Sequence, residues 1–132
     1  LSKRITDVAG ASKFYKGGAC TYCNEIKRKI LGVSKETLDR YTAVSVQTAE
    51  EMARGIAQVY GTDIGIGITG YAGPDGGEDG TPVGTIHIGI CFQGKAQVRT
   101  ICSPRGRENA RRDAANHALD MILRAAKKGA NG

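Results

Sequence analysis

The feature that most constrains the fold is a strand of alternating isoleucine and glycine that runs into a glycine-rich loop. Residues 64–68 read Ile-Gly-Ile-Gly-Ile, which is the period of two expected for a strand with one apolar face. Glycine on the opposite face leaves room for a helix or another backbone to approach closely. We therefore predict a buried strand over 63–69 with a close neighbour on its glycine face.

The loop after this strand has the composition of a ligand-binding loop. Glycine can adopt positive φ angles, so a loop rich in it can turn several backbone N–H groups toward one ligand. Proline restricts the backbone, and Pro74 and Pro82 favour a shaped loop over a mobile turn. Loops at the ends of buried strands often bind ligands in α/β proteins. We predict substrate-binding positions at Gly70, Gly73, Pro74, Asp75, Gly76 and Gly77.

Two familiar nucleotide-binding motifs do not apply. Residues 65–70 spell G-x-G-x-x-G, but the dinucleotide fingerprint requires this motif to open a helix. Here its first two glycines fall inside the predicted strand and a Pro-Gly loop follows. The sequence also contains no G-x-x-x-x-G-K-[ST] phosphate loop.

Length and charge limit the number of domains and the class of ligand. A chain of 132 residues suits one domain with one core, and its net charge of +6 suits an anionic partner. Basic runs interleaved with aromatic residues are missing, so we expect a small anionic ligand rather than nucleic acid, and nucleic-acid binding through the arginines stays open as an alternative. No apolar run approaches membrane-spanning length and no signal-peptide pattern opens the chain, so we expect a cytoplasmic protein without membrane contact. The sequence starts at Leu1, and we expect it to begin inside a helix.

The four cysteines do not indicate a metal or redox site. Cys20 and Cys23 form a C-x-x-C pair with no second pair and no nearby histidine. On a strand they would also point to opposite faces. A two-residue turn at 93–94 would place Cys91 opposite Ala96 rather than Cys102, so that register implies no bridge. We expect all four cysteines to be reduced and mostly buried.

The remaining patterns predict an α/β domain. The best-defined helix follows Ser45 and has an apolar stripe of Ala49, Met52, Ala53, Ile56, Val59 and Tyr60. The other expected elements are a helix end at 1–8, a strand at 17–22, short helices at 25–31 and 35–40, strands at 83–92 and 96–102, and a helix at 107–127 with an alanine-rich face. This order predicts a three-layer α/β/α sandwich with a mixed, mostly parallel sheet.

Two groups of residues could carry chemistry. Arg105, Arg107, Arg111 and Arg112 crowd the start of the last predicted helix. Cations oppose the helix dipole there, so a bound anion such as phosphate would explain Arg107, whereas a solvated basic face remains open for Arg111 and Arg112.

The second group is Ser12, Tyr22 and Lys27. A lysine whose pKa is lowered by burial or by nearby cations can activate a serine, and a tyrosine can relay the proton. A turn serine, a strand-end tyrosine and a solvated lysine remain the alternative. For His87 we expect a satisfied histidine facing the core or a helix, and we predict no metal.

Taken together, these segments resemble the C-terminal domain of the competence/damage-inducible protein A (CinA) family. The most specific part is the A-G-P-D-G-G loop with P-V-G-T downstream. The matching segments run in order through the chain: Gly10–Ser12, Thr21–Lys27, Leu31–Val33, Ala43–Ser45, Gly70–Gly77, Pro82–Thr85 and Arg107.

The resemblance implies a homodimeric hydrolase without metal or other cofactor. The implied activity is nicotinamide mononucleotide deamidase, an amidohydrolase of pyridine nucleotide recycling that releases nicotinic acid mononucleotide and ammonia. It places the catalytic serine, tyrosine and lysine on Ser12, Tyr22 and Lys27. Lys27 would act as base, Ser12 would form an acyl-enzyme, and backbone N–H groups would stabilise the oxyanion. From phosphate chemistry, and not from the resemblance, we expect the glycine loop and Arg107 to hold the ribose phosphate.

The sequence also departs from the family pattern. Members normally carry a strand and an A-E-S-x-T-G-G segment before the helix that ends near Val8. We therefore expect residues 1–132 to form a single CinA C-terminal-like domain without its N-terminal helix and first strand, active provided the real molecule contains that segment. The alternative is a non-catalytic nucleotide-binding or dimerisation module of a competence/damage-inducible protein.

Overall fold

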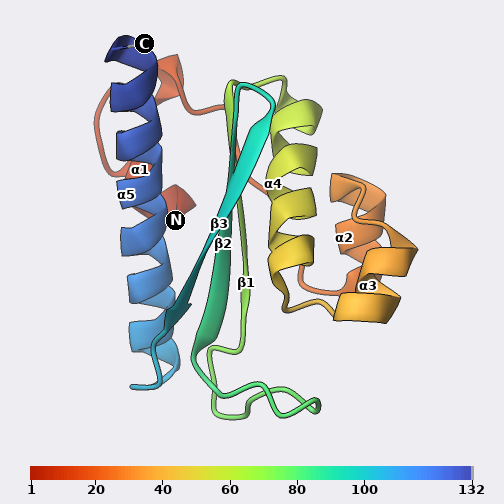
Figure 1. The fold of residues 1–132 in the computed structure, drawn as a ribbon. Helices are drawn as coiled ribbons and strands as arrows, with labels where there is room; N and C mark the ends of the chain where they lie inside the picture. Colours follow the sequence, from red (N-terminus) through yellow and green to blue (C-terminus); the bar gives the residue numbers. More distant parts are fainter. Residues whose placement is uncertain (132) are drawn as a thin grey trace.

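The computed structural model describes residues 1–131, in which five α-helices and a short 3₁₀ helix surround a small sheet (Figure 1). The elements are α1 (Ser2–Thr6), η1 (Ala11–Lys13), α2 (Asn24–Leu31), α3 (Lys35–Tyr41), α4 (Val46–Tyr60), β1 (Ile64–Gly70), β2 (Thr85–Phe92), β3 (Lys95–Cys102) and α5 (Arg107–Asn131). None of the helices in this part of the chain is long and apolar enough to cross a membrane.

The sheet has the order β1-β2-β3, and both described strand pairs are antiparallel. The α/β class is as predicted, but the mostly parallel sheet is wrong for the described residues. Parallel neighbours require a long crossover, usually a helix. Here β2 and β3 are joined by a two-residue turn, and the glycine loop returns the chain directly from β1 to β2. The turn places Cys91 opposite Ala96, which confirms the predicted register.

One face of the sheet is packed closely against α4. A Cβ atom added to Gly67 would lie 2.6 Å from the Met52 Cβ and 2.7 Å from the Ala53 backbone nitrogen. At Gly65 the added atom would lie 2.2 Å from the Ala53 carbonyl oxygen. The glycines of β1 are therefore what lets the helix backbone approach the strand, as the alternation predicts.

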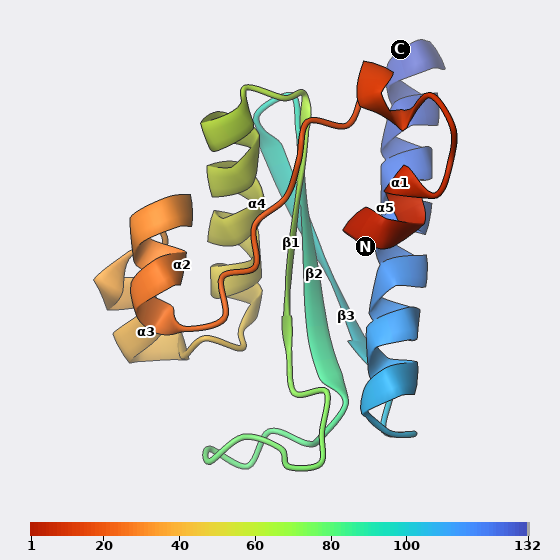
Figure 2. The ribbon, with the colours of Figure 1, turned by 180° about the vertical axis from the view of Figure 1, so that it is seen from behind.

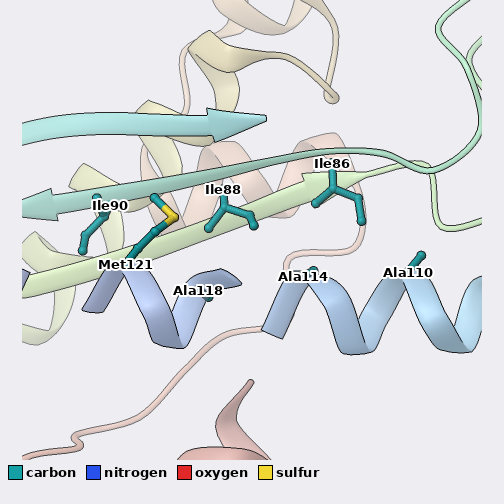
Figure 3. Packing of buried hydrophobic residues seen from close by; sticks show 7 residues of the cluster. All are labelled: Ile86, Ile88, Ile90, Ala110, Ala114, Ala118 and Met121. Atoms are coloured by element: carbon teal, nitrogen blue, oxygen red, sulfur yellow. The ribbon is translucent and has the colours of Figure 1, made fainter. Parts of the chain in front are cut away.

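The opposite face packs against α5 (Figure 3). Three isoleucines of β2, at positions 86, 88 and 90, meet the small side chains of the helix. The buried helix residues of this cluster are Ala110, Ala114, Ala118 and Met121, which belong to the predicted alanine-rich face, and Ala125 of the same face is partly buried. Helices thus cover both faces of the sheet, with α4 on one side and α5 on the other (Figures 1 and 2).

The predicted strand at 17–22 is wrong. This segment has no regular structure, and within the described residues it pairs with no strand. The Gly18 carbonyl instead accepts a hydrogen bond from the Tyr60 hydroxyl at 3.0 Å. The segment leads from η1 to α2, which packs on the outer side of α4 (Figure 2).

Two further expectations about burial are wrong. Of the four cysteines only Cys91 is buried, whereas the other three are exposed. Val59 is 55% exposed, and Ala57 takes a buried position on α4 in its place. Helical spacing alone predicts which residues share a face of α4. It does not predict which of them are covered by the sheet.

Candidate functional site

Lys27 lies in the first turns of α2 and is only 7% exposed. Glu25 in the first turn suits the helix dipole, and Gly32 ends the helix in the left-handed conformation. The Lys27 Nζ donates a hydrogen bond of 2.8 Å to the backbone carbonyl of Thr21. A lysine of this short helix is therefore folded back over the segment that precedes it rather than extended into solvent.

Burial lowers the pKa of Lys27 from its ordinary value of 10.5, while the neighbouring thiols of Cys23 and Cys20 oppose this shift. Desolvation disfavours the ammonium form, so the lysine is easier to deprotonate than one in water. Nearby cations do not contribute to this lowering. Sequence reasoning missed Thr21, because a backbone acceptor leaves no signal in the side-chain pattern.

Arg107 joins two other predicted residues. It is the first residue of α5 and follows Gly106, whose φ of +99° makes the turn into the helix. Its Nη1 donates to the Gly73 carbonyl at 3.0 Å, and its Nη2 donates to the Tyr22 hydroxyl at 3.1 Å. The structure thus brings the glycine loop, the start of α5 and the residue next to Thr21 into one cluster.

The loop between β1 and β2 is shaped by its own hydrogen bonds. The N–H of Gly77 donates to the Thr81 carbonyl at 2.8 Å, and the N–H of Gly80 donates to the Gly77 carbonyl. Within residues 1–131, no protein group accepts a hydrogen bond from the N–H groups of Gly73, Asp75 and Gly76. These three donors are available to an anion.

The other arginines of the basic group have different contacts. Arg105 lies 3.4 Å from the Asp113 carboxylate, and Arg112 lies 3.9 Å from the Glu108 carboxylate. Both are largely exposed, in agreement with a solvated basic face for Arg112. His87 is satisfied, since its Nδ1 lies 2.8 Å from the Thr100 hydroxyl, and burial lowers its pKa.

Ser12 does not join this cluster. It lies in η1 at the side of the molecule occupied by α5, whereas α2 and Lys27 lie beyond α4 on the other face of the sheet (Figures 1 and 2). No hydrogen bond links Ser12 to Tyr22 or Lys27 anywhere in the described chain. Within one copy of the chain, the predicted serine and lysine are therefore separated by the sheet.

Two shallow hollows of about 440 Å³ each lie away from this cluster, one over α3 and one between the end of α4 and the β2–β3 turn. Neither is lined by Tyr22, Lys27 or the glycine loop. Among residues 1–131, no three His, Cys, Asp or Glu side chains gather as a metal site would require.

Comparison with known proteins shows which family this sequence is similar to. The profile of the CinA C-terminal domain matches residues 1–126. A putative competence-damage inducible protein of Clostridium acetobutylicum is 46% identical over 124 residues, which is 94% of this chain and 30% of that protein. A CinA-like protein of Kosmotoga olearia is 47% identical over 125 residues, 95% of this chain and 30% of that protein. The chain thus spans about a third of the length of these curated relatives.

Solved structures show the same fold. A competence or damage-inducible protein from Enterobacter asburiae superposes with a TM-score of 0.91 at 38% identity, over 94% of this chain and 78% of that one. A CinA superfamily protein from Escherichia coli gives a TM-score of 0.89 at 37% identity, over 92% and 71% of the two chains.

Proposed function

The chain belongs to the CinA C-terminal domain family, and from this membership we propose that it hydrolyses the amide of nicotinamide mononucleotide. The products would be nicotinic acid mononucleotide and ammonia. In this proposal the protein is a cytoplasmic homodimer that needs neither a metal nor an organic cofactor. The names of its relatives speak only of competence-damage induction or of likeness to CinA, so the activity rests on the resemblance of the site residues and on their geometry.

The observation that carries the proposal is the buried Lys27 with its lowered pKa. An amide is attacked only by an activated nucleophile, and a lysine that is neutral in a larger fraction of molecules can take the proton from a hydroxyl group. Tyr22 lies next to Thr21, whose carbonyl holds the Lys27 ammonium. In this proposal the Tyr22 hydroxyl relays that proton.

The glycine loop and Arg107 supply a place for the phosphate. Three backbone N–H groups of the loop, at residues 73, 75 and 76, have no protein acceptor in the part of the chain described. Backbone donors of this kind suit a phosphate because they carry partial positive charge without a flexible side chain. Arg107 at the start of α5 adds a full positive charge beside them.

The reaction balances with one serine and one water. Lys27 removes the hydroxyl proton as the serine oxygen bonds to the amide carbon, and the C–N bond breaks as ammonia leaves with that proton. Water then cleaves the acyl ester to the acid and restores the serine. Because Ser12 of the same copy lies across the sheet, a second copy of the chain would supply Ser12 to this Lys27.

Ammonia release from nicotinamide mononucleotide tests the proposal directly. We expect turnover by the wild-type chain, and we expect Lys27→Ala to lower kcat by about 10²- to 10⁴-fold, the usual contribution of a general base. Lys29→Ala is the matched control, since Lys29 is an exposed lysine of the same helix. Circular dichroism of both variants establishes that α2 remains folded.

A second candidate function is favoured by the position of Ser12. If no nucleophile reaches Lys27, the cluster is a nucleotide-binding module without catalysis. Titration calorimetry would then show phosphate-dependent binding of the mononucleotide, while ammonia stays at background at every pH from about 6 to 9. Turnover that survives Lys27→Ala would contradict the amidohydrolase mechanism itself.

A further inference from the structure

A continuous series of contacts connects the glycine loop to Lys27. Arg107 holds the Gly73 carbonyl with one terminal nitrogen and the Tyr22 hydroxyl with the other. Tyr22 directly follows Thr21 in the chain, and the Thr21 carbonyl accepts the hydrogen bond of the Lys27 Nζ. Loop, arginine, tyrosine and lysine are thus linked through hydrogen bonds and a single peptide unit.

Tyr22 depends on Arg107 for its orientation. The tyrosine is 78% exposed, so little packing restricts its ring. Within residues 1–131, the Tyr22 hydroxyl accepts a hydrogen bond from Arg107 and from no other residue. The segment that carries Tyr22 has no strand pairing to hold it. An exposed side chain on an irregular segment would otherwise sample several rotamers.

Arg107 is by contrast well anchored. Its backbone opens the long helix α5, which is packed on the sheet through Ala110 and the residues that follow. Its guanidinium is planar and presents donors in a fixed fork, so the two bonds to Gly73 and Tyr22 fix the plane of the group. A lysine at the same position could not make both bonds in this geometry.

We propose that Arg107 is a positioning residue, which holds the Tyr22 hydroxyl in place and couples the segment that carries it to the glycine loop. This role rests on the proposed amidohydrolase and comes in addition to the phosphate binding proposed above, because it acts on the chemical step. A misplacement of about 1 Å at a reacting group commonly costs about 10² in rate. Loss of Arg107 therefore lowers kcat even for a substrate that has no phosphate.

The test compares nicotinamide mononucleotide with nicotinamide riboside, which lacks the phosphate. We expect Arg107→Met to lower kcat by about 10²-fold on both substrates, and Tyr22→Phe to do the same. The double variant should be no slower than the slower single variant, within about threefold, because both changes remove the same arrangement. Arg112→Met, which removes an equal charge five residues further along α5, should leave kcat unchanged.

The opposite pattern overturns the proposal. If Arg107 only binds the phosphate, Arg107→Met would raise KM for the mononucleotide and leave its kcat unaltered. The same variant would have no effect on turnover of the riboside. Additive losses in the double variant would show that Arg107 and Tyr22 act separately, which also contradicts the positioning role.

A second measurement keeps the inference testable if the wild-type chain shows no turnover, which would count against the proposed function alone. Carbon-labelled tyrosine reports the Tyr22 ring by NMR, with the resonance assigned by its loss in Tyr22→Phe. We expect this resonance to shift in Arg107→Met and to stay in place in Arg112→Met. An unchanged resonance in Arg107→Met would refute the contact on which the inference depends.

Discussion

Lys27 makes stability depend on pH in a direction that the structure fixes. Burial lowers its folded-state pKa below the ordinary 10.5 that it regains on unfolding. Between those two values the unfolded chain binds a proton that the folded chain does not, so the free energy of unfolding rises with pH. We expect wild-type stability to increase relative to Lys27→Met as pH rises toward 10.5. Urea unfolding at a series of pH values measures this difference.

The control for this measurement is Lys29→Met, which removes an exposed lysine from the same helix. Its stability should run parallel to that of the wild type over the whole range. If the difference between wild type and Lys27→Met falls with rising pH, the Lys27 ammonium is stabilised by folding and could not serve readily as a base.

The contact between β1 and α4 depends on glycine having no side chain. A Cβ at Gly67 would meet backbone atoms of Ala53 and Ala49 at 2.7 and 2.8 Å, and backbone atoms cannot rotate away. Overpacking of this kind commonly costs about 1–3 kcal/mol. We therefore expect Gly67→Ala to lower the free energy of unfolding by about 2–3 kcal/mol or to prevent folding, as measured by urea denaturation.

Gln97→Ala serves as the matched control because Gln97 is an exposed strand position on β3. Its effect should stay within about 0.5 kcal/mol. A Gly67→Ala protein as stable as this control would show that α4 can shift away from β1 at little cost.

Elements with strong local signals could be predicted from the sequence. The isoleucine–glycine alternation gave β1, the turn at 93–94 gave the β2–β3 register, and the alanine stripe gave the buried face of α5. Whether residues 17–22 form a strand could not be predicted from local signals. A strand exists only when another strand pairs with it, and pairing depends on residues distant in the sequence. The mostly parallel sheet was predicted from the order of all the elements, and that order does not show which strands pair.

Local sequence patterns identify the residues of the site, whereas only the folded structure shows how these residues contact one another. Tyr22, Lys27, Arg107 and Gly73 come from three separate segments, and their contacts arise from packing. Their catalytic and binding roles remain predictions. The position of Ser12 depends on how the chain passes around the sheet, which no motif encodes.

Separation of Ser12 from Lys27 by the sheet implies a site shared between two copies, if Ser12 is the nucleophile. Ser12→Ala and Lys27→Ala would then each be inactive alone. In a two-fold dimer each mixed pair combines one intact Ser12 with one intact Lys27 at a single site, so random mixing should restore about a quarter of wild-type ammonia release. Mixed dimers isolated by co-expression with two affinity tags keep one of their two sites, so they should reach about half of wild-type ammonia release. Mixing Lys27→Ala with Lys27→Arg, which supplies no intact lysine, should restore none. A mixture of the first pair that stays inactive would contradict the shared site, and a fully active Ser12→Ala would mean that Lys27 activates a different nucleophile.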